Sequence, residues 1–141
     1  MRLLIYFALM SFATNALANN IIEGNQGSKI KGSVVERFQN PWAMSFISSD
    51  RLLVTTKSGD LWLVNTSGEK SLVAGVPNVF YGGQGGLGDV VPHPNFEQNN
   101  FIYISYISSD TAGDTRYATV VRAQLNIKSL PKLENLSLIH I

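Results

Sequence analysis

From Ser33 onward, the hydrophobic positions come in short runs that are continuous or alternate with polar positions, and no stretch of helical length repeats every 3.6 residues. Runs of this kind, separated by Gly, Asp, Ser and Asn, are typical of β-strands joined by tight turns. The pattern therefore predicts an all-β protein. The first four strands are expected at Trp42–Phe46, Leu52–Thr56, Leu61–Val64 and Ser71–Val73.

The same pattern then begins again. Three further strands are expected at Leu87–Val91, Phe101–Ile107 and Thr119–Leu125. Trp42 and Leu87, which start the two sets, are 45 residues apart (87 − 42 = 45), within the ~40–50 residues of a propeller blade. Because one meander cannot bury both of its faces, such units normally stack around a channel. We therefore expect the first blades of an incomplete β-propeller, with a second meander that lacks its fourth strand.

The N-terminal residues are predicted to lie outside this domain. Arg2 precedes the apolar run Leu3–Phe12, and Ala16-Leu17-Ala18 has the small-x-small pattern of a cleavage site. Residues 1–18 are therefore expected to be a signal peptide, and the mature protein to be periplasmic or secreted. A membrane anchor is the alternative, but the apolar run is shorter than the roughly 20 residues of a spanning helix. Residues 19–32 have the composition of a flexible leader, which leaves 33–135 as a partial propeller domain.

Residues 136–141 read LSLIHI, which is what the mosaic end of a widely used sequencing transposon adapter encodes in one reading frame. We interpret these residues as an adapter scar, with a genuine edge strand as the alternative. Sequencing the parent locus across Asn135 is expected to replace LSLIHI with further blade sequence. Recovery of LSLIHI followed by a genuine stop codon would contradict this interpretation.

Composition and charge restrict the classes of function. With 45% hydrophobic and 15% charged residues, the chain of 141 residues fits a globular protein. Eleven basic and ten acidic residues give a net charge of +1 without a basic stripe, so nucleic acid is not expected as a partner. The chain has no cysteine, so redox chemistry would need a bound cofactor.

The glycine-rich segment 82–88 (GGQGGLG) formally contains the dinucleotide-binding pattern GxGxxG. That motif requires a helix after the glycines, whereas Pro92 and Pro94 follow here. A second interpretation is that the glycines let the backbone run close to a ligand while Gln84 projects from it and binds a hydroxylated substrate. A flexible connection between blades is the alternative.

Two other polar residues are weaker candidates. His93 lies between two prolines, with no second ligand or catalytic partner at a familiar spacing, and is interpreted as structural. Asp89 lies inside an apolar strand, where an acid or metal ligand is less common than a side chain bonded to nearby amides. The aromatic residues, Trp42 and Trp62 among them, are interpreted as packing residues rather than a sugar-stacking platform.

Several segments together resemble the soluble, quinone-dependent aldose sugar dehydrogenases, the glucose and sorbosone dehydrogenase family. They are NPWAMSF, DRLLVTT, SGDLWLVN, GVPNVFYGGQGGLGDVVPHPNF and NNFIYISY, between Val34 and Leu125. The most specific part is GlyGlnGlyGlyLeu followed at fixed separation by HisProAsnPhe. The resemblance implies a six-bladed β-propeller in which Gln84 contributes to the substrate site. This chain departs from the family pattern at Thr56-Lys57, where Glu-Arg is common.

The resemblance also implies pyrroloquinoline quinone and calcium as cofactors, an aldose oxidised at its anomeric carbon to a lactone, and an external electron acceptor. The catalytic histidine and the quinone-binding residues would lie beyond Leu125, so no catalytic, cofactor or metal residue is assigned in this chain. A non-catalytic secreted propeller that serves as a binding module is the alternative, since this architecture hosts many functions.

Overall fold

A computed structural model describes residues 20–110, 112–113 and 115–139. The predicted signal peptide, residues 1–18, lies outside the described residues. The chain divides into two units, one up to Val34 and one from Val35 onward, and each is described by itself. Among the described residues, no helix has both the length and the hydropathy needed to cross a bilayer.

The first unit contains an antiparallel hairpin of β1 (Asn20–Glu23) and β2 (Lys29–Gly32). The sequence analysis expected no strand in this segment. The hairpin forms because Gly27, at φ 80°, permits a tight turn in which its N–H donates to the Gly24 carbonyl over 3.0 Å. Its side chains are exposed, Ile22 by 62% for example, so the hairpin has no core of its own.

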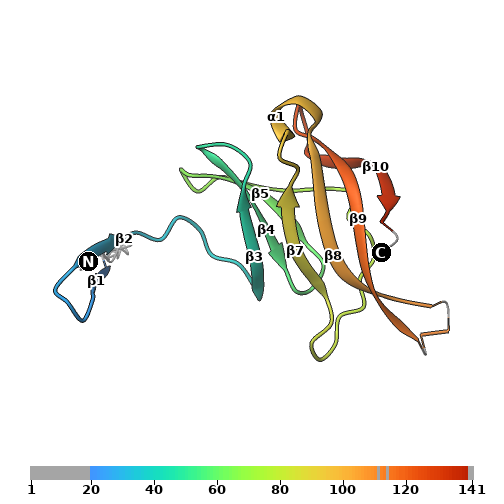
Figure 1. The fold of residues 1–141 in the computed structure, drawn as a ribbon, viewed down its shortest axis with the longest axis horizontal. Coiled ribbons are helices and arrows are strands. Elements are labelled where there is room, and N and C mark those ends of the chain that lie inside the picture. Colours follow the sequence, from blue (N-terminus) through green and yellow to red (C-terminus); the bar gives the residue numbers. More distant parts are fainter. Residues whose placement is uncertain (1–19, 111, 114, 140–141) are drawn as a thin grey trace, which may run out of the picture. The chain divides into compact units, whose positions relative to one another are not determined.

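The second unit contains two four-stranded antiparallel sheets in which consecutive strands are neighbours (Figure 1). The first sheet consists of β3 (Pro41–Phe46), β4 (Arg51–Thr56), β5 (Leu61–Asn65) and β6 (Lys70–Leu72). The second consists of β7 (Leu87–Pro92), β8 (Phe101–Ser109), β9 (Arg116–Asn126) and β10 (Lys132–Leu138), with one helical turn, α1 (Phe96–Asn99), before β8. The initial strands β3 and β7 lie side by side. The predicted all-β class and the seven predicted strands are confirmed.

The second sheet has a fourth strand, so the expectation that this meander lacks one is wrong. In β10, Leu133 lies opposite Leu125 of β9, and Leu138 lies opposite Val121. Leu133 is 6% exposed, and its N–H donates to the carbonyl of Ala74 over 2.8 Å. Burial of this leucine and its bond to the chain after β6 explain why the strand forms. The strand includes residues 136–138, and the adapter origin of LSLIHI stays a prediction.

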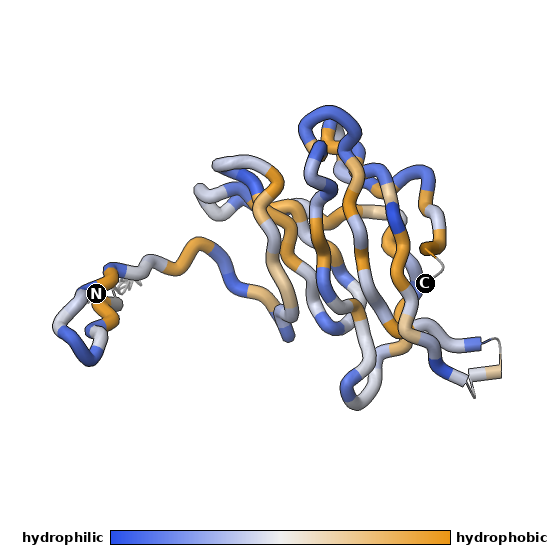
Figure 2. Tube along the Cα trace, in the orientation of Figure 1, coloured by the Kyte–Doolittle hydropathy of each residue, from blue (hydrophilic) through white to orange (hydrophobic). Residues whose placement is uncertain are grey.

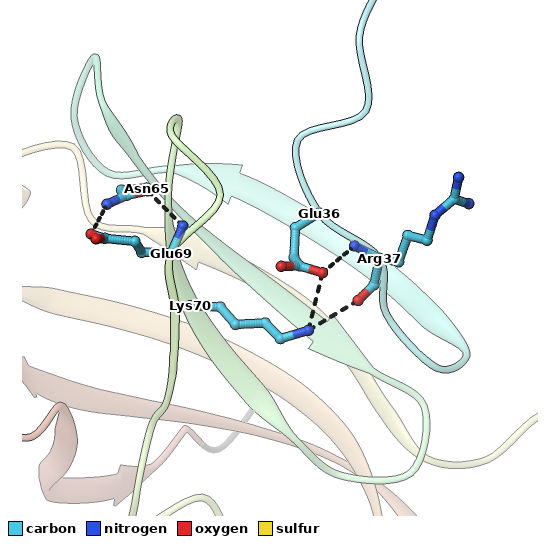
Figure 3. A network of polar contacts seen from close by, with 5 residues as sticks. All are labelled: Glu36, Arg37, Asn65, Glu69 and Lys70. Carbon is cyan, nitrogen blue, oxygen red and sulfur yellow. Dashed lines mark hydrogen bonds and ion pairs between the residues drawn. The ribbon is translucent and has the colours of Figure 1, made fainter. Parts of the chain in front are cut away.

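The turns follow from short polar side chains and glycines. Between β5 and β6, the Asn65 side-chain oxygen accepts the Ser67 N–H at 3.1 Å. The same oxygen accepts the Glu69 N–H at 2.9 Å (Figure 3). Gly68 in the same turn has a φ of 98°, which favours glycine. An asparagine that bonds to the backbone two residues onward is typical of turns, and it ends β5 at this point.

The core lies where the inner faces of the two sheets meet, and apolar residues recur along these strands in Figure 2. The fully buried apolar side chains include Leu53 and Leu61 from the first sheet and Leu87, Ile102, Ile104 and Leu125 from the second. Burying each such side chain contributes about 1.5–3 kcal/mol. The sheets are also joined by a hydrogen bond, since the buried Thr55 hydroxyl donates to the Gly88 carbonyl over 2.8 Å. These contacts fix the start of β7 against the end of β4.

Candidate functional site

The glycine-rich segment forms a tight turn immediately before β7. The Gly85 N–H donates to the Gly82 carbonyl over 2.8 Å. Gly83 has a φ of 55° and Gln84 is not in the positive-φ region, the pattern of a type II′ turn, which favours glycine at its first central position. Gln84 takes the second central position, where its side chain is exposed. The turn therefore presents one amide, with two donors and an oxygen acceptor.

Gln84 lines a pocket of about 270 Å³, slightly below the roughly 300–1,000 Å³ that is usual for ligand pockets. The pocket is lined by Trp42, Lys57, Gln84, Gly86, Leu87, Gly88, Ser105, Tyr106, Ile107, Ala118, Thr119 and Val120. Residues from both sheets thus meet at the place where the sequence analysis expected a substrate-binding glutamine. The structure supplies the neighbours of that glutamine.

Gly86 allows the glycine segment to pass close to the end of β4. This residue is buried at a φ of 146°, and an added Cβ would collide with the Lys57 carbonyl oxygen and lie 2.9 Å from its Cγ. The Leu87 N–H donates to the same carbonyl over 3.2 Å, and the Gly86 carbonyl accepts the Ile107 N–H over 3.0 Å. The sequence analysis explained the glycines by a close approach to a ligand. At Gly86, the close approach is to the protein's own backbone.

Lys57 connects the glycine turn to Trp42. Its ammonium donates to the Gly83 carbonyl over 2.6 Å and lies 5.5 Å from the centroid of the Trp42 ring. Trp42 is 54% exposed and lines the pocket, so in this chain it is not the packing residue that the sequence predicted. The sequence marked Lys57 only as part of a departure from the family pattern and gave it no role at the site, because a lysine before Ser-Gly-Asp is ordinary turn composition.

His93 and Asp89 are not among the residues that line this pocket. The His93 Nδ1 accepts the Asn95 N–H over 3.0 Å, which places the proton of the neutral ring on Nε2, and the ring stacks on Tyr103 at 6.1 Å. These contacts support the structural interpretation of His93. The backbone N–H of the exposed Asp89 donates to the Ser105 hydroxyl over 2.9 Å.

The pocket has the chemistry of a binding site for hydroxylated molecules. An amide hydrogen-bonds hydroxyl groups, and the face of an aromatic ring takes the apolar face of a ring-shaped ligand. Burial raises the pKa of the Tyr106 phenol, so this group stays protonated at neutral pH and does not serve as a base. The lining residues supply no proton acceptor for an oxidation.

The residues around this pocket do not match either of the two cofactors implied by the resemblance. No three His, Cys, Asp or Glu side chains in the described part of the chain lie together as metal ligands. Lys57 is the one cationic side chain among the residues that line the pocket, and its ammonium is bonded to the Gly83 carbonyl. These residues do not make up a quinone or calcium site, and His140 lies outside the described residues.

Comparison with known proteins finds sugar dehydrogenases. Aldose sugar dehydrogenase YliI of Escherichia coli (strain K12) is 36% identical over 89 residues, which are 61% of this chain and 23% of that protein. Protein slr1608 of Synechocystis, which is uncharacterized, is 31% identical over 111 residues, or 72% of this chain and 27% of its own. This chain therefore spans about a quarter of the length of the curated relatives it matches.

Solved structures have the same fold. The apo-form of the soluble aldose sugar dehydrogenase from Escherichia coli matches with a TM-score of 0.65 and 31% identity, over 72% of this chain and 29% of that one. The pyrroloquinoline quinone-bound form of aldose sugar dehydrogenase from Streptomyces coelicolor matches with a TM-score of 0.63 over 72% of this chain and 30% of its own; at 22% identity it supports the fold alone. The two sheets are blades of a β-propeller. The profile of the Glucose / Sorbosone dehydrogenase family matches residues 38–140, and the chain belongs to that family.

Proposed function

We propose that the protein is a pyrroloquinoline quinone- and calcium-dependent aldose sugar dehydrogenase, exported to the periplasm, which oxidises the anomeric carbon of an aldose to the lactone. A bound quinone would supply the two-electron acceptor for this oxidation, and the residues that would hold it, together with the histidine that would take the hydroxyl proton, are expected beyond Leu125. The residues of this chain contribute substrate binding. Gln84 hydrogen-bonds a sugar hydroxyl, and the pocket around it holds the sugar at the start of β7.

The observation that carries this proposal is the placement of Gln84. Its exposed amide sits at the tip of a glycine turn and lines a pocket together with Trp42 and Lys57. The family and the aldose sugar dehydrogenase of Escherichia coli support a sugar as the ligand. The signal-like residues 1–18 support export.

Replacing Gln84 by alanine in the full-length protein, loaded with quinone and calcium, is expected to lower kcat/KM for the aldose about five- to thirtyfold. The physical reason is the loss of one hydrogen bond to the sugar, which costs about 1–2 kcal/mol. Steady-state oxidation with an artificial electron acceptor measures this change. Quinone affinity and melting temperature should stay at the parent values, because the change removes only an exposed side chain and leaves the backbone of the turn and its hydrogen bonds in place.

Gln98→Ala is the matched control, because Gln98 is another exposed glutamine and lies on α1, away from the residues that line the pocket. It should retain the parent activity. If Gln84→Ala stays within about twofold of the parent at an equal melting temperature, the glycine segment is only a connection between blades. Sugar binding without any turnover by the loaded parent would favour the alternative of a non-catalytic binding module.

A further inference from the structure

Lys57 makes two contacts that hold the glycine turn from outside. Its ammonium donates to the carbonyl of Gly83, the residue immediately before Gln84, and lies over the ring of Trp42. Its backbone is fixed independently, since its N–H donates to the Asn40 carbonyl over 2.9 Å and its carbonyl accepts the Leu87 N–H over 3.2 Å. A side chain with an anchored backbone therefore reaches across to the tip of the turn.

From these contacts we propose that Lys57 is a positioning residue for substrate binding: it holds the Gly82–Gly85 turn and thereby fixes the Gln84 amide toward the sugar. This inference rests on the proposed function for the role of Gln84. The turn itself has one backbone hydrogen bond, from Gly85 to Gly82. Three of its four residues are glycines, which have the largest backbone freedom to lose. A charge-assisted bond to the turn's own carbonyl restricts this freedom where Gln84 is attached.

Trp42 contributes to the same arrangement. A cation over an aromatic face within about 6 Å is attracted by the ring, and the Lys57 to Trp42 distance of 5.5 Å meets this condition. This attraction keeps the Lys57 ammonium beside the turn and disfavours conformations in which the lysine side chain extends into water. A guanidinium also stacks on aromatic rings and donates to carbonyls, so arginine should replace Lys57 with little loss.

Lys70 offers a matched control within the same sheet. Its ammonium lies 5.0 Å from the Phe38 ring and 5.5 Å from the Trp62 ring, and donates to the Arg37 carbonyl over 3.1 Å. It also pairs with Glu36 at 3.2 Å (Figure 3). Lys70→Met therefore removes the same kinds of interaction as Lys57→Met, at a place that does not include the glycine turn.

Amide hydrogen exchange of the full-length protein tests whether Lys57 holds the turn, and it needs neither sugar nor turnover. In Lys57→Met, exchange across residues 82–87 is expected to be about fivefold faster than in the parent, because a stabilising contact of the turn is lost. Lys57→Arg should restore slow exchange, and Lys70→Met should leave it unchanged. Equal exchange in Lys57→Met and the parent would overturn the proposal, and so would an equal acceleration in Lys70→Met.

A double-mutant cycle tests whether Lys57 acts through Gln84. Lys57→Met alone is expected to lower kcat/KM about three- to tenfold, mainly through KM, whereas in the Gln84→Ala protein it should change kcat/KM by less than about twofold. If Lys57→Met lowers kcat/KM by the same factor in the parent and in the Gln84→Ala protein, Lys57 does not act through Gln84 and the positioning role is overturned. If Gln84→Ala itself leaves activity unchanged, the proposed function of Gln84 fails, and the exchange measurement still decides whether Lys57 holds the turn.

Discussion

Replacing Gly86 by alanine is expected to destabilise the protein by about 2–6 kcal/mol. Its φ of 146° is a conformation that essentially only glycine adopts, and forcing another residue into it costs about 1–3 kcal/mol. The new methyl group would in addition collide with the Lys57 carbonyl oxygen, and overpacking of this kind costs about 1–3 kcal/mol. Because that oxygen accepts the Leu87 N–H, relief of the collision would also weaken the contact between β4 and β7. Denaturant unfolding of the full-length protein measures the loss.

Gly83→Ala is the control for this prediction, because it changes a glycine of the same glycine-rich segment. Gly83 also has a positive φ, of 55°, but nothing lies within 4 Å of an added Cβ. Only the backbone conformation is then penalised, by about 1–2 kcal/mol. If Gly86→Ala is no more destabilising than Gly83→Ala, the close approach to Lys57 does not constrain the folded protein.

Leu53→Ala is expected to lower the free energy of unfolding by about 2–5 kcal/mol, as large-to-small changes in a packed core do. Leu53 is 0% exposed in the middle of β4, and it belongs to the cluster that contains Ile102 and Ile104 of the second sheet. The change leaves a cavity where the two sheets meet, so both sheets should lose stability together. Thermal unfolding followed by near-ultraviolet circular dichroism and by hydrogen exchange in each sheet measures this coupling.

Leu130→Ala is the matched control, because Leu130 is 83% exposed between β9 and β10. The same chemical change should there alter stability by less than about 0.5 kcal/mol. Faster exchange in the first sheet alone after Leu53→Ala would show that the two sheets do not share one cooperative core.

The positions of the strands β3 to β9 were determined by the sequence itself. Alternating or continuous apolar runs of three to seven residues, separated by turn residues such as Ser67-Gly68, specify where a strand begins and ends. This information is local, because a side chain's direction in a strand alternates with a period of two residues and glycine permits the turn. The glycines around Gln84 likewise indicated, from the sequence alone, a turn from which this side chain projects.

Three strands, β10 and the two strands of the β1–β2 hairpin, were not predicted from the apolar pattern. β10 forms because Leu133 is buried and its backbone bonds to Ala74, a residue far away in the sequence. The mostly polar residues Pro131–Asn135 do not alternate between apolar and polar positions over enough residues to indicate that this strand pairs with β9. The described side chains of the β1–β2 hairpin are all exposed. The hairpin therefore has no buried apolar face, and the apolar pattern of the sequence did not indicate it.

The surroundings of Gln84 were decided only by the tertiary structure. Lys57 and Gly83 are separated by 26 residues, and their 2.6 Å hydrogen bond exists because the core and the Thr55 to Gly88 bond bring the end of β4 against the start of β7. Trp42, the second residue of β3, lies beside them because β3 is next to β7, and its side chain is exposed there. Sequence patterning reports which residues can be buried, whereas contacts between distant segments depend on how the two sheets pack. The sequence therefore identified the glutamine, and the packing of the sheets placed the lysine and the tryptophan around it.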